Sequence, residues 1–292
     1  MNTASDKALG LIFGIIVFLF AFSCLAPFLL VIIASFTDEA TLVREGYQII
    51  PAKWSLNAYK AIFRSSTIPK AYGVSIFITV AGTFLSMLVT SMGAYSLSCK
   101  KLRYRNQLAF FFYFTMLFSG GLVANYILIS KYLKLRNTIW VYIIPSLLNP
   151  WNMFMLRNFF RDVPEALRES AHLDGAHEWT IMMRIILPLS LPALATISLF
   201  YALNFWNAWM EAMLYIDNED LYSLQYIIMK IIRNINSAAS IAVEGASTGI
   251  VVPPSYTIRL ATAIVTIGPI VFLYPFLQKY FVTGLKIGGV KG

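Results

Sequence analysis

Long apolar blocks that contain no Lys, Arg, Asp or Glu dominate the pattern of the chain. About 20 such residues cross about 30 Å of hydrocarbon, and in lipid only a helix pairs all backbone groups within one segment. The pattern therefore predicts an all-α membrane protein with six transmembrane helices. The blocks are Leu9–Phe36, Ala71–Ser98, Gln107–Ser130, Asn137–Leu156, Ile185–Met210 and Leu260–Gln278.

Composition agrees with a membrane location. Of 292 residues, 58% are hydrophobic and 13% charged, whereas soluble domains carry about 25% charged residues. The net charge of +9 lies mostly between the apolar blocks and lacks the aromatic interleaving of nucleic-acid grooves, so no nucleic acid is expected. The first block is too long for a signal peptide and is interpreted as a retained span.

Charge counting barely orients the chain, because Lys and Arg are nearly equal on the two sides. The dense cluster at Lys100–Arg105 favours cytoplasmic termini, whereas Lys131, Lys134 and Arg136 oppose it.

The polar segment Arg157–Arg184 predicts two short helices outside the lipid. Asp162 with Glu165 is typical of a helix N-cap and its reciprocal acid, and Pro164 fits a first turn. This helix should end near Leu173.

A bend at Asp174–Gly175 is expected next, since glycine adopts backbone conformations that other residues resist. Helix should resume over His177–Ile186, before Pro188. Taken alone, the segment is interpreted first as an amphipathic connector resting on lipid headgroups, and a surface for a partner is the alternative.

No motif supplies chemistry. The chain has no phosphate-cradling Gly-rich loop ending in Lys-Ser/Thr, so it should not hydrolyse ATP alone. His172 and His177 lie on different helix faces and two cysteines give no ligand spacing, so no metal site is predicted. The absence of intramembrane carboxylates weighs against a proton-coupled carrier.

Within this segment the sequence resembles the EAA motif of permease subunits of binding-protein-dependent ABC importers. The triplet Glu169-Ser170-Ala171, a Gly after three residues, and an Ile-x-Leu-Pro ending have the spacing of that motif, with Ser170 in place of the middle Ala. The resemblance assigns ATPase coupling to Glu169, Ser170, Ala171, Gly175, Ile185, Leu187 and Pro188.

The tail Gly284–Gly292 and the run Phe205–Trp209 followed by Leu224-Gln225 are similar to the carbohydrate branch of that family, which includes maltose permease and LplC-type permeases. The resemblance implies the type I ABC importer permease fold as a single transmembrane domain over residues 1–292. It also implies a bacterial inner-membrane location, a cytoplasmic coupling loop at 157–184, a periplasmic segment at 211–257 and two cytoplasmic termini.

The same resemblance implies the partners. These are a second, homologous permease subunit, two ATP-binding subunits and a soluble or lipid-anchored sugar-binding protein. ATP and Mg would be bound by the ATPase subunits, and this chain would carry no catalytic residue and no cofactor.

Aromatic and amide side chains suggest a sugar path, because sugars are held by stacking and by amide hydrogen bonds. The same residue types also serve membrane interfaces and helix packing. Candidate path residues are Asn204, Trp206, Asn207, Trp209, Glu211, Asn149 and Asn152. In the Gly-rich outer loop, the candidate contacts to the binding protein are Gly245, Ser247, Gly249 and Val251.

An excess of basic residues in the outer segments favours an acidic oligosaccharide, such as alginate or pectin fragments. A neutral oligosaccharide remains an alternative. An ATP-independent carrier or channel is a less favoured alternative. A membrane-embedded enzyme is also less favoured, because nothing places a nucleophile beside a base.

Overall fold

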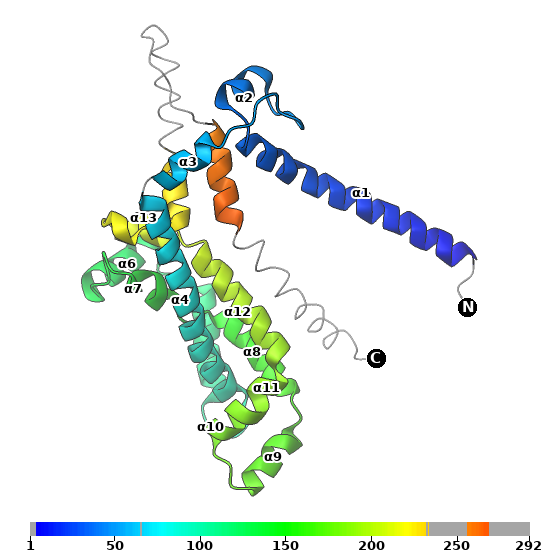
Figure 1. Cartoon of the computed structure of the whole chain (residues 1–292). Helices are drawn as coiled ribbons and strands as arrows, with labels where there is room; N and C mark the ends of the chain where they lie inside the picture. The colour runs from blue at the N-terminus through cyan, green and yellow to red at the C-terminus, as the bar shows by residue number, and fades with distance from the viewer. Residues whose placement is uncertain (1–3, 65, 232, 234–255, 269–292) are drawn as a thin grey trace. The chain divides into compact units, whose positions relative to one another are not determined.

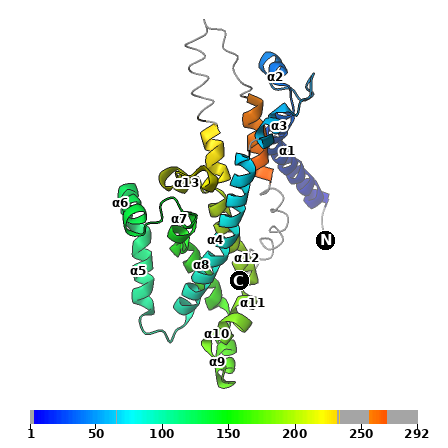
Figure 2. The same cartoon turned by 60° about the vertical axis from the view of Figure 1, so that its left-hand side comes forward.

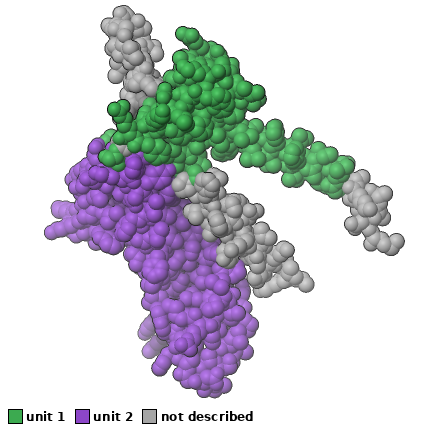
Figure 3. Space-filling view, in the orientation of Figure 1, with its two compact units in different colours: residues 1–66, 228–269 green, residues 67–227, 270–292 purple. Residues whose placement is uncertain are grey.

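A computed structural model describes residues 4–64, 66–231, 233 and 256–268. These residues form helices and turns, with one isolated bridge between Thr37 and Trp54. The chain divides into two compact units, Met1–Ser66 with Ile228–Pro269 and Thr67–Ile227 with Ile270–Gly292 (Figure 3).

The first unit contains α1 (Ala4–Ser35), α2 (Glu39–Glu45), α3 (Asn57–Arg64) and the helix Tyr256–Gly268. The Glu39 carboxylate accepts hydrogen bonds from the backbone N–H groups of Tyr256 (3.1 Å) and Thr257 (2.9 Å). It thereby satisfies free donors at the start of that helix. The hydroxyls of Ser35 and Tyr59 lie 2.8 Å apart and tie α3 to the end of α1.

Helix α1 confirms the helix predicted for the first apolar block. Its 26 residues Gly10–Ser35 are long and apolar enough to cross a membrane. An 18-residue apolar stretch of this helix contains no buried residue. It therefore presents bare apolar surface on its sides.

The second unit is built around α4 (Thr67–Ser98), α8 (Pro150–Asp162) and α12 (Leu191–Trp206), which pack side by side (Figures 1 and 2). At Gly82 an added Cβ would lie 2.8 Å from the Phe205 ring, so glycine permits the close approach of α4 and α12. Buried polar contacts converge on the Tyr201 hydroxyl, which lies 2.7 Å from the Thr90 hydroxyl and accepts the Asn149 N–H at 3.0 Å. The three helices thus form one core.

The third predicted span, Gln107–Ser130, is not one continuous helix in the structure. The structure has α5 (Arg105–Leu117), followed by α6 (Gly121–Ile127) and the π-helical turn η1 (Leu128–Tyr132), bent by 113°. Gly121 has φ +79°, which favours glycine and allows the chain to change direction.

The fourth and fifth predicted spans are also interrupted. The block Asn137–Leu156 holds α7 (Trp140–Ile143), the 3₁₀ turn η2 (Ile144–Ser146) and the start of α8. The block Ile185–Met210 bends by 87° between Glu178–Leu189 and Leu191–Trp206. Pro192 explains this bend, since it lacks an N–H and is tolerated only in a first helical turn.

Among the described residues, two helices are long and apolar enough to span a membrane, or up to four if each bent pair is one span. The predicted sixth span, Leu260–Gln278, is described only as far as Gly268.

Near the first residues of α4, the second unit is completed by α13 (Met210–Tyr215), the turn η4 (Glu219–Leu221) and the first residues of a helix at 224–231. An ion pair between Lys70 and Asp220 (2.7 Å) links η4 to the start of α4.

Candidate functional sites

The EAA-like segment forms α9 (Glu165–Leu173) and α10 (Glu178–Ile181), followed by the π-helical turn η3 (Met182–Ile186) and α11 (Leu187–Leu189). They lie at one end of the second unit (Figure 1). The predicted N-cap is wrong, because Asp162 is the last residue of α8 and Pro164 occupies the N-cap position of α9 without a side-chain cap bond. The tight turn at Val163–Pro164 explains the shift, since proline disfavours helix in the residue before it.

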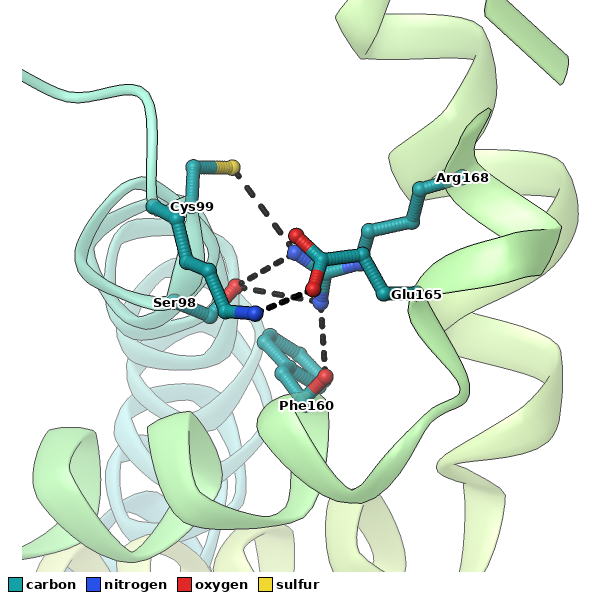
Figure 4. Close-up of polar contacts among 6 residues, drawn as sticks. Ser98, Cys99, Phe160, Glu165 and Arg168 are labelled. Carbon is teal, nitrogen blue, oxygen red and sulfur yellow. Dashed lines mark hydrogen bonds and ion pairs between the residues drawn. The ribbon is translucent and has the colours of Figure 1, made fainter. Parts of the chain in front are cut away.

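Arg168 fastens α9 to two neighbouring helices (Figure 4). Its Nη1 and Nη2 each donate to the Ser98 hydroxyl at 3.2 Å, and Nη2 also donates to the Phe160 carbonyl at 2.6 Å. Its guanidinium lies 5.6 Å from the centre of the Tyr95 ring. One side chain therefore bridges α9, the end of α4 and the end of α8.

Further polar contacts reinforce this connection. Lys100, just beyond α4, forms an ion pair with Glu165, and its hydrogen bond holds the pKa of that carboxyl below its usual range. The Tyr95 hydroxyl donates to Glu178, whose other oxygen lies 3.2 Å from the His172 Nε2. The end of α4 is thus linked to both α9 and α10.

The predicted bend at Gly175 is confirmed. Its φ is +80°, and an added Cβ would meet nothing within 4 Å, so backbone conformation, not crowding, requires glycine. The Gly175 N–H donates to the His172 carbonyl (3.0 Å) and the Ala176 N–H to the Ala171 carbonyl (2.9 Å). These bonds satisfy carbonyls that the end of a helix leaves free.

The motif residues divide between an inner and an outer face. Ala171 is buried in the core with Ile186, while Ile185 and Leu187 pack against it. Glu169, Ser170 and Pro188 are exposed.

Leu173 is the most exposed of the large apolar side chains described in this segment, at 90%, whereas Leu167, Trp179 and Leu189 are 41% to 56% exposed. Four residues after Glu169, it lies on the same face of α9. Sequence reasoning did not single out Arg168 or Leu173, although the i, i+4 spacing of Glu169 and Leu173 could have indicated a shared face.

At the other end of the second unit, four of the seven candidate path residues line one open hollow of about 450 Å³. These are Asn204, Asn207, Trp209 and Glu211, together with Phe200, Leu203, Ala208 and Met210. The side chain of Asn207 is held by two hydrogen bonds. Its Nδ2 donates to the Leu203 carbonyl (2.9 Å), and its Oδ1 accepts from the Gln225 Nε2 (3.2 Å). Amides, an aromatic ring and a carboxylate thus face one space.

The other three candidates lie elsewhere. Trp206 is 6% exposed, and its ring centre is 6.4 Å from that of Tyr72; within the described chain its buried Nε1 has no hydrogen-bond partner. Asn149 caps α8 by accepting the N–H groups of Trp151 and Asn152, and Asn152 is itself buried. The candidate contacts Gly245, Ser247, Gly249 and Val251 lie outside the described residues.

Comparison with known proteins defines the class of this chain. Residues 2–287 match the family described as the binding-protein-dependent transport system inner membrane component, and the chain belongs to this family. It is therefore a multi-pass inner-membrane permease component, all-α, with the type I ABC importer permease fold.

Particular relatives narrow the class. The chain is 41% identical to the polygalacturonan/rhamnogalacturonan transport system permease protein YtcP of Bacillus subtilis, over 97% of both chains. It is 41% identical to protein LplC of the same organism, over 91% of this chain and 89% of LplC. A chain in the crystal structure of a bacterial ABC transporter involved in the import of the acidic polysaccharide alginate superposes with a TM-score of 0.83. That chain is 28% identical, and the match covers 96% of the present chain and 99% of that one.

Proposed function

We propose that this chain is the membrane-spanning permease subunit of an ATP-driven importer of oligosaccharides, folded as one transmembrane domain over residues 1–292. It works with a second permease subunit, two ATP-binding subunits and a sugar-binding protein, and ATP with Mg is bound by the ATPase subunits. Family membership supports this assignment, and the observation that carries it is the way α9 is built.

Helix α9 combines a firmly held inner side with a bare outer side. Arg168 and Glu165 attach it to α8 and to the end of α4, whereas Glu169 and the 90% exposed Leu173 have no cover from the described chain. A partner that covers Leu173 removes apolar surface from water. When that partner moves, the hydrogen bonds and ion pairs of α9 would move α4 and α8 with it. Alternating access requires such a coupled movement of the membrane helices.

A docking test follows from this face. Leu173→Asp and Glu169→Lys should each weaken assembly with the ATPase subunits. The first variant places an unpaired charge in the interface and the second reverses an existing charge, and either change should cost about 2 to 5 kcal/mol of binding free energy. Glu45→Lys, a charge reversal at an exposed residue of α2 in the first unit, is the control. Co-purification of the ATPase and substrate uptake in reconstituted vesicles are measured. Wild-type assembly and uptake in both α9 variants would show that this segment is only a connector.

The orientation proposed is that α9 and both termini are cytoplasmic. Helix α4 has 32 residues, and a helix of that length measures about 48 Å, enough to separate its two ends across a membrane. In a variant without Cys24 and Cys99, a cysteine at Asn218 should react with an impermeant thiol reagent from outside. A cysteine at Arg103 should react only after the membrane is opened, and the reverse pattern contradicts this orientation.

The proposed substrate is an acidic oligosaccharide, with a neutral one as the alternative. Polygalacturonan and alginate, named in one relative and in the alginate transporter, support the acidic choice. The hollow itself offers no cation to an acid group, because Glu211 is the one charged residue among those that line it. An acidic chain would therefore present its hydroxyls to this wall.

Stimulation of ATP hydrolysis in the reconstituted importer tests which oligosaccharide is the substrate. Galacturonate and mannuronate oligomers should stimulate ATP hydrolysis with the loaded binding protein, and neutral oligomers of equal length should stimulate it less. A preference for the neutral series would replace the acidic proposal and leave the importer function intact. Deletion of Ser247–Val251 should abolish this stimulation if that loop contacts the binding protein.

A further inference from the structure

Three arginines gather where α5 begins and α8 ends. Arg105 is the first residue of α5, and Arg157 and Arg161 lie one turn apart on α8. Burial, and then the positive charges of Arg161 and Arg105, lower the pKa of the Arg157 guanidinium. The three side chains therefore share one repulsive electrostatic environment.

No carboxylate in the described chain forms an ion pair with any of the three. Arg157 lies over the Phe154 ring, 5.7 Å from its centre, and its buried Nε has no hydrogen-bond partner in the described part of the chain. Partly buried charges are ordinarily paired, because desolvation without a partner is costly.

Beside them is a polar pocket of about 440 Å³ between the end of α4 and the α8–α9 turn. Its charged lining comprises Lys100, Arg105, Arg161, Arg168, Asp162 and Glu165, an excess of two positive charges. Lys100 is paired with Glu165, and Arg168 bonds Ser98 and Phe160. Arg105 and Arg161 remain as the donors toward an anion.

We infer that Arg105 and Arg161 form a binding site for the phosphate group of an anionic phospholipid, with Arg157 adding positive charge beside the pocket. Guanidinium groups match phosphate oxygens with paired hydrogen bonds, and basic pockets between membrane helices are suited to anionic headgroups.

A lipid, and not a soluble anion, is favoured by the surface that continues from the pocket. None of the residues of α5 is buried. From Arg105, a row of exposed apolar side chains follows this helix at every third residue, with Leu108 42%, Phe111 60% and Phe114 46% exposed. An acyl chain can lie along this row while its headgroup reaches the arginines.

The test uses the purified full chain in detergent, titrated with phosphatidylglycerol or with phosphatidylcholine and followed by native mass spectrometry. Wild type should retain phosphatidylglycerol preferentially. Arg105→Gln and Arg161→Gln should each lower this retention about fivefold, the value of one basic residue near an anionic lipid surface. Arg184→Gln, at an exposed arginine of η3 outside the cluster, is the matched control and should change nothing.

Two further measurements test whether the arginines bind the lipid directly. The double variant Arg105→Lys with Arg161→Lys keeps the charges but loses the paired hydrogen bonds, so it should bind phosphatidylglycerol less tightly than wild type and more tightly than the double variant Arg105→Gln with Arg161→Gln. Equal losses in the two double variants would show a structural effect and overturn the site. Inorganic phosphate is the second probe. If inorganic phosphate binds the chain as tightly as phosphatidylglycerol does, the proposed lipid site is wrong. The same conclusion follows if the glutamine variants bind phosphatidylglycerol as tightly as wild type.

Discussion

The two ends of the second unit differ in how their polar groups are used. At the α9 end, Arg168, Glu165 and Glu178 are engaged with α4, so polar side chains join helices together. At the hollow, Asn204 is exposed and Trp209 and Glu211 are half-buried around open space. Bonded polar groups make an element rigid, whereas open ones are available to a ligand. Variants at the first end should therefore disturb coupling, and variants at the second should disturb substrate affinity.

The largest effect is expected for Gly175→Leu. At φ +80° a leucine costs about 1 to 3 kcal/mol, and relief of that strain would turn α10 away from α9. Uptake by reconstituted vesicles should fall to background while membrane insertion stays normal. Gly175→Asn should restore much of the activity, because Asn tolerates this conformation. Gly73→Leu, at an exposed α4 position with open space around it, is the control; normal uptake by Gly175→Leu would contradict the role of the bend.

A smaller loss is expected for Arg168→Ala, which removes the bridge from α9 to Ser98 and Phe160. Hydrogen bonds of a charged group contribute about 1.5 to 3 kcal/mol, so sugar moved per ATP hydrolysed should fall about tenfold or more. Arg168→Lys should recover only part of it, since an ammonium lacks the planar fork. Arg184→Ala serves as the control. An unchanged ratio of sugar moved to ATP hydrolysed in Arg168→Ala would show that the contacts of Arg168 do not couple α9 to the membrane helices.

A shift in affinity without a loss of coupling is expected for Asn204→Ala at the hollow. One hydrogen bond to a sugar hydroxyl is worth about 0.5 to 1.5 kcal/mol, so the KM for uptake should rise about 2- to 12-fold. The ratio of sugar to ATP should stay constant. Asn158→Ala, at an exposed α8 position, controls for general effects. A changed ratio with an unchanged KM would remove Asn204 from the substrate path.

The smallest effect concerns the exposed ion pair of Glu165 with Lys100. Because the pKa of Glu165 is lowered in the folded chain, its contribution to stability is present above the ordinary carboxyl pKa and is lost as the pH falls through the lowered value. Glu165→Gln should therefore melt slightly below wild type at neutral pH and converge with it in acid. Thermal unfolding at several pH values checks this, and the Lys100→Met variant should behave in the same way. A gap that widens in acid would contradict the assignment.

Sequence alone was most informative where local rules decide the outcome. Charge-free length specified α1 and α4 as helices, since backbone pairing in lipid leaves no alternative. The Asp174–Gly175 pair located the bend that φ +80° now shows. Family motifs indicated the class of protein, which the family match confirms. The coupling role of the EAA-like residues stays a prediction.

Only the tertiary structure decided which apolar blocks stay straight and what each polar residue does. Hydropathy cannot register a bend at Gly121 or before Pro192, because the residues on both sides remain apolar. Residue type made Asn204 and Trp206, and more weakly Asn149, candidates for the sugar path, whereas the structure exposes Asn204, buries Trp206 and makes Asn149 a helix cap. Arg168 was one charge among many until folding brought Ser98, 70 positions away, within 3.2 Å of it. Such contacts depend on which helices pack together, and that arrangement is set by the whole core and not by any local segment.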